Sequence, residues 1–475
     1  MSATPRGMSV LEGYRLFRSN KFIVNRKYQR KLVWTLEEKQ KLIDSIIEGF
    51  PIPLIMLAFN LDKKGEKTFE VLDGMQRLSA IFAFIENRFD WGGKYFNVAH
   101  LSRADELSKR GVFDVVDDDT LLLEQELCSS FLEYTLAITE FPSNNESAVT
   151  EVFRRINAYG KQLSSQEQRQ AGVISPFANL VRELSSELRG DVSKNKLDLS
   201  EMPTISVDTT TVGEKEYGIS ADEMFWCQHG ILRKNQLRDS EDEQLVADLV
   251  ISIVEEQPFA FSGSKLDEYY NQGSEKYKSI NEDVISYGTT RIKHEIQSTI
   301  SIIKSILEDD EKVTSLRSIV HPRTSNPIKT AFHAVFFAFH ELCVVQRMSP
   351  SNEEEILNAL SGLQKQLHVA AGQILSDKRS KNIKITKALI EDFFEDIEPP
   401  AIQHGDASSI KFENAIRRSK IETAAFECKQ GLLTLSNERA IQPGLLTKIV
   451  NTLCGIANIG PESEGGLFIG VADCE

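Results

Sequence analysis

The chain has 475 residues, a formal net charge of −15 at pH 7 and 41% hydrophobic residues. This length predicts two to four domains, and the composition is typical of a globular protein. No run of 18 apolar residues occurs, and the first residues lack a basic block followed by an apolar one. We therefore expect neither a transmembrane span nor a secretory signal. The six cysteines have no CxxC spacing, which argues against a disulfide framework or a zinc knuckle and favours the cytoplasm.

The negative net charge matters for any contact with nucleic acid. A uniformly acidic surface repels a phosphate backbone, so such a contact requires a local basic patch. One candidate patch holds five positive residues and no acidic one: Lys21, Arg26, Lys27, Arg30 and Lys31. A second runs from residue 378 to residue 387. The first patch predicts DNA contacts through Lys21, Arg26, Lys27 and Lys31, with a solvated surface run as an equally weighted alternative, whereas a surface run is favoured for the second.

The first segment mixes helices and strands. Thr35 and Glu38 form a capping box that predicts a helix, with apolar residues at helical spacing after it. Gly49 stands where a C-terminal cap requires a positive φ, so the helix ends there. The apolar run 54–59 predicts a buried strand, and residues 69–72 predict a second strand after a polar turn.

Further helices and a strand are predicted along the chain. A helix is expected just after Gly74, and residues 135–141 predict another strand. A further helix is marked by Val149, Phe153 and Ile156, and Ser164 with Glu167 forms a second capping box.

From about residue 166 to residue 394 the apolar spacing is mostly helical. Residues 332–339 are apolar nearly all round, which predicts a core helix. The stretch 397–412 combines proline, glycine and polar residues and is typical of a linker. A final segment follows it.

The first candidate for chemistry is the turn Asp73-Gly74-Met75-Gln76-Arg77, where a predicted strand meets a predicted helix. Gly74 permits a tight turn and a close approach of a ligand to the backbone. The helix N-terminus favours an anion such as phosphate, and Arg77 can add a bidentate contact. Asp73 can hold a metal ion or orient a water molecule. A plain Asp-Gly turn is the more frequent alternative when this stretch is considered alone.

Two further stretches place this turn in a wider pattern. Tyr28-Gln29-Arg30 followed by Trp34 stands upstream, and Phe153-Arg154-Arg155-Ile156-Asn157 followed by Gly160, Leu163 and Ser164 stands downstream. In order and spacing, residues 8–175 resemble the N-terminal domain of the GmrSD-type modification-dependent restriction endonucleases.

The resemblance implies a ParB/sulfiredoxin-like fold, a small mixed sheet with flanking helices. It also implies that the turn binds or hydrolyses a nucleoside triphosphate, ATP or GTP with Mg²⁺, and controls DNA cleavage. The residues carried over to catalysis are Asp73, Gln76 and Arg77. Those carried over to nucleotide binding are Gln29, Arg30, Gly74, Arg155 and Asn157.

Two departures from the family pattern bear on activity. Met75 stands where the family usually has a second glutamine, and methionine neither orients water nor donates to phosphate, so we expect binding with weaker hydrolysis. Many relatives carry an HNH nuclease domain, whose histidine general base typically follows an aspartate. None of the eight histidines here follows an aspartate. His333 and His340 are expected to share one face of an apolar helix as core histidines rather than metal ligands.

The second candidate lies in the last seventy residues. A strand around Phe426 and Cys428, an amphipathic helix ending at Asn458, and a strand after Gly465 and Gly466 are expected there. Pairing of the two strands would bring Glu422, Glu427 and Asp473 together as a carboxylate cluster for a divalent metal, with ordinary surface carboxylates as the alternative.

This last segment resembles the Schlafen AlbA-like domain, with Cys428 in place of the usual phenylalanine and a small insertion before Gly465. Some members of that family cleave RNA or DNA, and others bind nucleotide or DNA. Because the segment stops two residues after Asp473, we expect an incomplete domain.

Together these features predict an α+β protein: a mixed-sheet domain at 8–175, a mostly helical region at 176–396, a linker at 397–412 and a partial α/β domain at 413–475. The predicted function is a nucleotide-binding or nucleotide-hydrolysing module of a defence or restriction system acting on nucleic acid, either an NTPase or an NTP-regulated nuclease. The alternative is a non-catalytic DNA-binding regulator. Nucleic acid is the expected partner, with a second copy or a partner subunit as a further possibility and no membrane.

Overall fold

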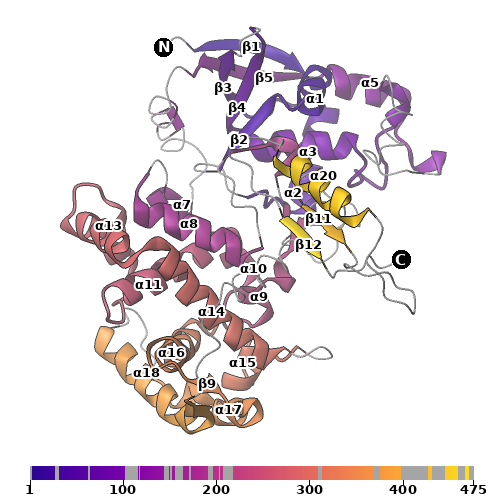
Figure 1. The fold of residues 1–475 in the computed structure, drawn as a ribbon. Coiled ribbons are helices and arrows are strands. Elements are labelled where there is room, and N and C mark those ends of the chain that lie inside the picture. The colour runs from indigo at the N-terminus through magenta and orange to yellow at the C-terminus, as the bar shows by residue number, and fades with distance from the viewer. Residues whose placement is uncertain are drawn as a thin grey trace.

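The computed structural model has two main regions, a sheet-containing region and a helical one, which occupy opposite ends of the molecule in Figure 1. It describes residues 3–26, 31–61, 65–101, 116, 118–143, 149, 152–153, 155, 164–170, 173–190, 196–202, 204–206, 218–308, 313–368, 375–396, 426–429, 444–457 and 466–469. The mixed sheet followed by a mostly helical middle confirms the predicted α+β class.

The sheet has six strands in the order β1-β5-β3-β4-β2-β6. Their bounds are β1 Thr4–Ser9, β2 Phe22–Asn25, β3 Ile55–Leu61, β4 Lys67–Asp73, β5 Thr135–Pro142 and β6 Lys196–Asp198. The pairs β5/β3 and β4/β2 are parallel, and the pairs β1/β5, β3/β4 and β2/β6 are antiparallel. The sheet therefore draws on residues before position 8 and after position 175.

One face of the sheet carries the larger core of this region. Alternate strand residues such as Ile55, Leu57 and Val71 pack there against four helices. These are α1 Val10–Arg18, α2 Leu36–Ile47, α3 Met75–Ile85 and α5 Gln125–Glu133, with short 3₁₀ turns at η1 Val98–His100 and η2 Asp119–Leu121. The period of two along a strand sends the intervening residues to the other face.

The other face has a smaller core, in which Ala58, Leu72 and Phe141 pack with Val149 and Phe153. The two faces confirm that the central strands are buried on both sides, as their continuous apolar runs predict. The capping boxes at residues 35–38 and 164–167 are both present.

The helical region begins with α7 and surrounds one large core. Its helices are α7 Ser165–Gln170, α8 Pro176–Leu188, α9 Phe225–Gln228, α10 Lys234–Arg238, α11 Glu241–Val254, α12 Gly263–Tyr270, α13 Glu275–Tyr287, α14 Thr289–Leu307, α15 Leu316–Val320, α16 Lys329–Phe339, α17 Glu353–Ala359 and α18 Ser376–Ile390. Its short turns are η4 Ala221–Glu223, η6 Leu363–Lys365 and η7 Glu391–Phe393, with a π-helical turn η5 at His340–Val345, whereas the turn η3 Leu199–Glu201 packs in the sheet region. Two small sheets pair β7 Thr204–Ser206 with β8 Gly218–Ser220 and β9 Ser349–Pro350 with β10 Phe394–Glu395.

Helix α16 is the predicted core helix, because Phe332, Phe336 and Phe339 are all at most 1% exposed. His333 is buried on it, and burial beside Arg379 lowers the pKa of His333 well below its usual value. His340 lies 3.1 Å from Glu295 through Nε2. Both histidines thus belong to the interior, as expected. Among the helices that the structure describes, none has the length and apolar character needed to cross a membrane.

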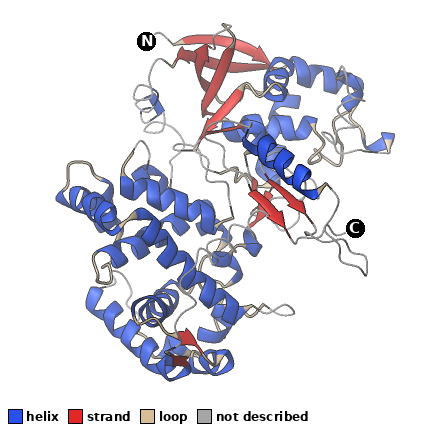
Figure 2. Ribbon diagram, in the orientation of Figure 1, coloured by secondary structure: helices blue, strands red, loops and turns tan. Residues whose placement is uncertain are grey.

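The C-terminal segment contains β11 Phe426–Lys429, α20 Leu445–Ala457 and β12 Gly466–Ile469. The two strands pair in parallel, with Phe426 opposite Gly466 and Cys428 opposite Phe468. Figure 2 shows this pair of strands as a unit separate from the large sheet. The predicted strand-helix-strand order is therefore confirmed.

Candidate functional site

The turn that joins β4 to α3 is built around Asp73 and Gly74. Gly74 is the N-cap of α3 and has φ +96°, a left-handed conformation that favours glycine. A Cβ added at this position would lie 2.9 Å from Ile55 Cγ1. The glycine is therefore required both by its backbone conformation and by the close approach of β3.

Asp73 ends β4 with a carboxylate that is 48% exposed. Its Oδ1 accepts a hydrogen bond from the Gly74 N–H at 2.8 Å, and its Oδ2 lies 2.9 Å from Arg77 Nη2. Arg77 Nη2 also donates to the Leu54 carbonyl at 3.1 Å. Arg77 thus braces the turn against the start of β3, while half of the Asp73 carboxylate faces solvent and can reach a ligand.

The first turn of α3 lacks the usual means of neutralising a helix N-terminus. It has no acidic residue, and among the described residues no side chain caps its N–H groups. These groups and the helix dipole favour an anion. The turn therefore combines an exposed carboxylate with an anion-favouring backbone.

Gln76 does not point into solvent as a free catalytic side chain. Its Nε2 donates to the Lys31 carbonyl at 2.7 Å, and its Oε1 accepts from the Val33 N–H at 3.2 Å. The amide therefore uses both its donor and its acceptor to hold the backbone of residues 31–33 against α3. The predicted catalytic role of Gln76 is not supported by this orientation.

Met75 is 6% exposed and packs in the larger core of the sheet region. Its thioether offers neither a hydrogen-bond donor nor a strong acceptor. The position that the family usually fills with glutamine is here part of the hydrophobic core.

One residue of the downstream motif, Phe153, packs close to the turn. Phe153 packs in the small core that also contains Leu72, the residue before Asp73. Arg155, two residues further along, is exposed. The structure thus brings Phe153 to the strand that carries Asp73, whereas residues 154, 156 and 157 lie outside the described residues.

Three members of the basic patch predicted around residues 21–31 lie in the described part of the chain: Lys21, Arg26 and Lys31. Lys21 is paired with Glu66 at 2.6 Å, and Arg26 is only 7% exposed. Lys31 is 6% exposed and enters the helical region. The expectation of surface contacts with DNA is therefore wrong for Arg26 and Lys31, because both side chains are buried. Lys27, Gln29 and Arg30 lie outside the described residues.

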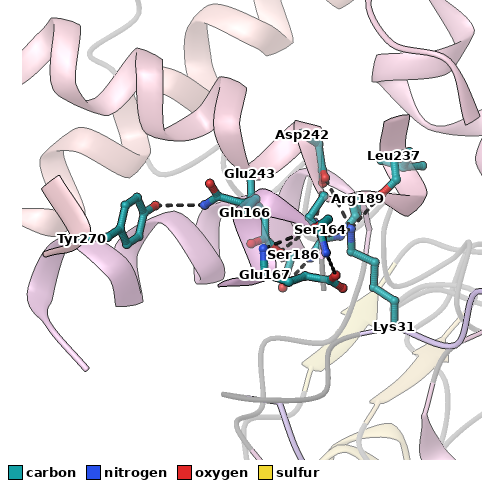
Figure 3. Close-up of polar contacts among 11 residues, drawn as sticks. Lys31, Ser164, Gln166, Glu167, Ser186, Arg189, Leu237, Asp242, Glu243 and Tyr270 are labelled. Carbon is teal, nitrogen blue, oxygen red and sulfur yellow. Dashed lines mark hydrogen bonds and ion pairs between the residues drawn. The ribbon is translucent and has the colours of Figure 1, made fainter. Parts of the chain in front are cut away.

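Lys31 is the feature that the sequence did not reveal. Its Nζ donates to the Leu237 carbonyl at 2.9 Å and to Ser240 Oγ at 3.1 Å, and it lies 3.4 Å from Asp242 Oδ1 (Figure 3). Asp242 also pairs with Arg189. The only sequence signal was the acidic first turn of α11, Glu241-Asp242-Glu243, which does not identify a partner more than 200 positions away.

Burial affects the two charges of this contact in different ways. Burial lowers the pKa of Lys31, although Asp242 opposes the shift. Burial alone would raise the pKa of Asp242, but Arg189 and Lys31 outweigh it and hold that pKa below its usual value. The pair is therefore a buried structural contact of opposite charges.

Of the three predicted C-terminal metal ligands, Glu427 lies in the described part of the chain. Glu427 lies in β11, with its backbone opposite Leu467. Glu422 and Asp473 lie outside the described residues. Within the described part of the chain, no group of three or more histidine, cysteine, aspartate or glutamate side chains is arranged to hold a metal ion.

Comparison with known proteins adds one finding. No curated protein and no solved structure matches the chain. The family model described as the GmrSD restriction endonuclease N-terminal domain, however, matches residues 14–174, about a third of the sequence. This stretch contains the Asp73 turn, the strand and helix on either side of it, and the segment around Phe153. In residues 14–174 the chain is therefore similar to the N-terminal domain of GmrSD restriction endonucleases.

Proposed function

We propose that the Asp73 turn binds the phosphate groups of a nucleoside triphosphate, ATP or GTP, together with Mg²⁺, in a restriction-type defence protein that acts on nucleic acid. The observation that carries this proposal is the start of α3 at a positive-φ glycine, directly after a half-exposed carboxylate and with no acidic residue in the first helical turn. The similarity of residues 14–174 to a restriction endonuclease domain supports the wider role.

The chemistry of the turn fits a phosphate ligand. Unpaired N–H groups at a helix N-terminus bind phosphate, and Gly74 lets a ligand approach the backbone closely. Mg²⁺ is usually held by one or two carboxylates plus substrate phosphates, so Asp73 alone is a sufficient protein ligand. Arg77 orients Asp73, and Gln29, Arg30, Arg155 and Asn157 are assigned to flanking contacts with the nucleotide.

A second candidate is a regulator that binds nucleotide without hydrolysing it. The buried Met75 favours this alternative, because that side chain cannot position the attacking water. The orientation of Gln76 toward residues 31 and 33 favours it as well. A sensor of this kind would not contact DNA through Arg26 or Lys31.

We also assign the C-terminal segment to an effector similar to the Schlafen AlbA-like domain. The parallel pairing of β11 with β12 supports this assignment. Glu422, Glu427 and Asp473 are its proposed divalent-metal ligands. Loss of Mg²⁺-dependent cleavage of DNA or RNA in Glu427→Gln, with wild-type nucleotide binding retained, would support the assignment, and cleavage at the wild-type rate would contradict it.

The deciding experiment measures binding and hydrolysis of ATP and GTP with Mg²⁺ by the wild type, Asp73→Ala and Asp222→Ala. Asp222 is a matched control, because its side chain is also 48% exposed and pairs with Lys234 at 2.6 Å. We expect binding to be lost only in Asp73→Ala. Turnover in the wild type would make the turn an active site, and binding without turnover would make it a sensor. Absence of binding by the wild type would overturn the proposal.

A further inference from the structure

An extended segment, residues 31–34, lies between the two main regions and contacts both; we call it the strap. Leu32 and Trp34 pack with the core of the sheet region. Val33 packs against the core of the helical region, and Lys31 makes its contacts there. Alternate side chains of extended backbone point in opposite directions, so each region receives every second residue of the strap.

The strap backbone is held from the side of the Asp73 turn. Gln76, the second residue of α3, bonds the Lys31 carbonyl and the Val33 N–H. In extended backbone these two groups face the same way, so the amide of Gln76 takes the place of a neighbouring strand. These two hydrogen bonds therefore tie the strap backbone to the first turn of α3.

The side chain of Lys31 ends in a buried group of charged side chains at the start of α11. The side chains of Lys31, Asp242 and Arg189 are 4%, 0% and 1% exposed. Figure 3 shows Lys31 extending toward Asp242, which belongs to α11, and Arg189, which is the C-cap residue of α8. A lysine withdrawn from these partners would leave Asp242 with Arg189 alone, so the buried contact strongly favours one position of the strap.

We propose that the strap couples the Asp73 turn to the helical region, with Lys31 as a positioning residue for the turn. The inference rests on the proposed nucleotide site and adds to it a route by which bound nucleotide reaches the helical region. A phosphate bound at the first turn of α3 shifts Gln76, and Gln76 shifts the strap backbone. The strap in turn shifts Lys31 relative to its partners at the start of α11. By reciprocity, a change in the contacts of Lys31 alters the affinity of the Asp73 turn for the nucleotide.

Part of the test needs no nucleotide. Gln76→Glu keeps the size of the side chain but removes the donor to the Lys31 carbonyl. We expect faster hydrogen–deuterium exchange both at residues 31–33 and in the first turn of α11, which Gln76 does not touch. Arg238→Gln is the matched control, because the Arg238–Glu38 pair (2.7 Å) joins the same two regions without involving the strap. Unchanged exchange at α11 in Gln76→Glu, or equal changes there in both variants, would overturn the coupling.

The second part measures the affinity for ATP with Mg²⁺. Lys31→Met removes the charge, and the milder Ser240→Gly removes one of its three contacts at a residue with φ +62°. We expect Lys31→Met to weaken binding by about fivefold or more, Ser240→Gly to weaken it less, and Arg238→Gln to leave it unchanged. A merely structural role for Lys31 would instead give affinity losses that follow thermal stability in all three variants. If the wild type binds no nucleotide, the proposed function fails while the exchange experiment still decides whether the strap couples the two regions.

Discussion

Helices α3 and α11 begin in the same unusual way but meet different surroundings. Each has a positive-φ residue at its N-cap, Gly74 in α3 and Ser240 in α11, and neither N-cap side chain accepts a hydrogen bond from the helix. Each is accompanied by an aspartate–arginine pair. The first turn of α11 contains three acidic residues, whereas that of α3 contains none.

The difference explains why one helix start is structural and the other is a candidate site. At α11 the protein's own carboxylates satisfy the helix dipole, and Lys31 and Arg189 neutralise the buried Asp242 and Glu243. At α3 the first turn holds no acidic residue, and the neighbouring Asp73 carboxylate accepts a hydrogen bond from the Gly74 N–H but remains 48% exposed. The same local conformation is therefore structural where the protein's own carboxylates occupy the helix start, as in α11. It is a candidate ligand site where the first turn has no carboxylate and an external anion can bind, as in α3.

The largest expected effect on stability is at the start of α11, where Lys31, Asp242 and Arg189 form a buried contact that we call the anchor. Asp242→Ala leaves Lys31 and Arg189 buried without their main partner, so we expect a loss of about 3–5 kcal/mol in the free energy of unfolding. Urea unfolding of the variant and the wild type measures it. A loss below about 1 kcal/mol would mean that water reaches the anchor and that it behaves as a surface pair.

A smaller effect is expected from the backbone of the turn. Gly74→Ala places a Cβ at φ +96° and within 2.9 Å of Ile55, so we expect a loss of about 2–4 kcal/mol from conformational strain and overpacking. Gly49→Ala is the control, because Gly49 has φ +76° but open space around it, and it should lose only about 1–2 kcal/mol. Equal losses in the two variants, measured by urea unfolding, would show that β3 does not constrain the turn.

The sequence predicted the elements whose signals are local. The capping box at Thr35, the positive φ at Gly49 and the strand-turn-helix around Gly74 each depend on a few neighbouring residues and are present in the structure. The short strands β1, β2 and β6 were not predicted, because two of them have only three or four residues and all three gain stability from distant partners in the sheet.

Within the site, too, the residues with local signals were predicted and the contacts with distant residues were not. Asp73 and Gly74 were identified from adjacent residues, and the structure places them at the expected turn. Lys31 was assigned to a surface because a run of like charges is usually solvated. Its burial depends on Leu237, Ser240 and Asp242, and no local pattern relates a lysine to a helix that begins more than 200 residues later. Gln76 was assigned to catalysis through the family resemblance, and its contacts with the backbone of residues 31 and 33 were missed because that backbone is distant in sequence.

The smallest expected effect on stability is at Asp73 itself. A half-exposed ion pair contributes about 0–1 kcal/mol, so Asp73→Asn should unfold at nearly the same urea concentration as the wild type, and the remaining difference should shrink in about 1 M salt. The same substitution should remove most of the affinity for ATP with Mg²⁺, because the metal loses a charged ligand. An aspartate that is nearly neutral for folding and decisive for binding is what a ligand site requires. A large stability loss in Asp73→Asn would instead make the Asp73–Arg77 pair a second anchor, and the contrast between α3 and α11 would disappear.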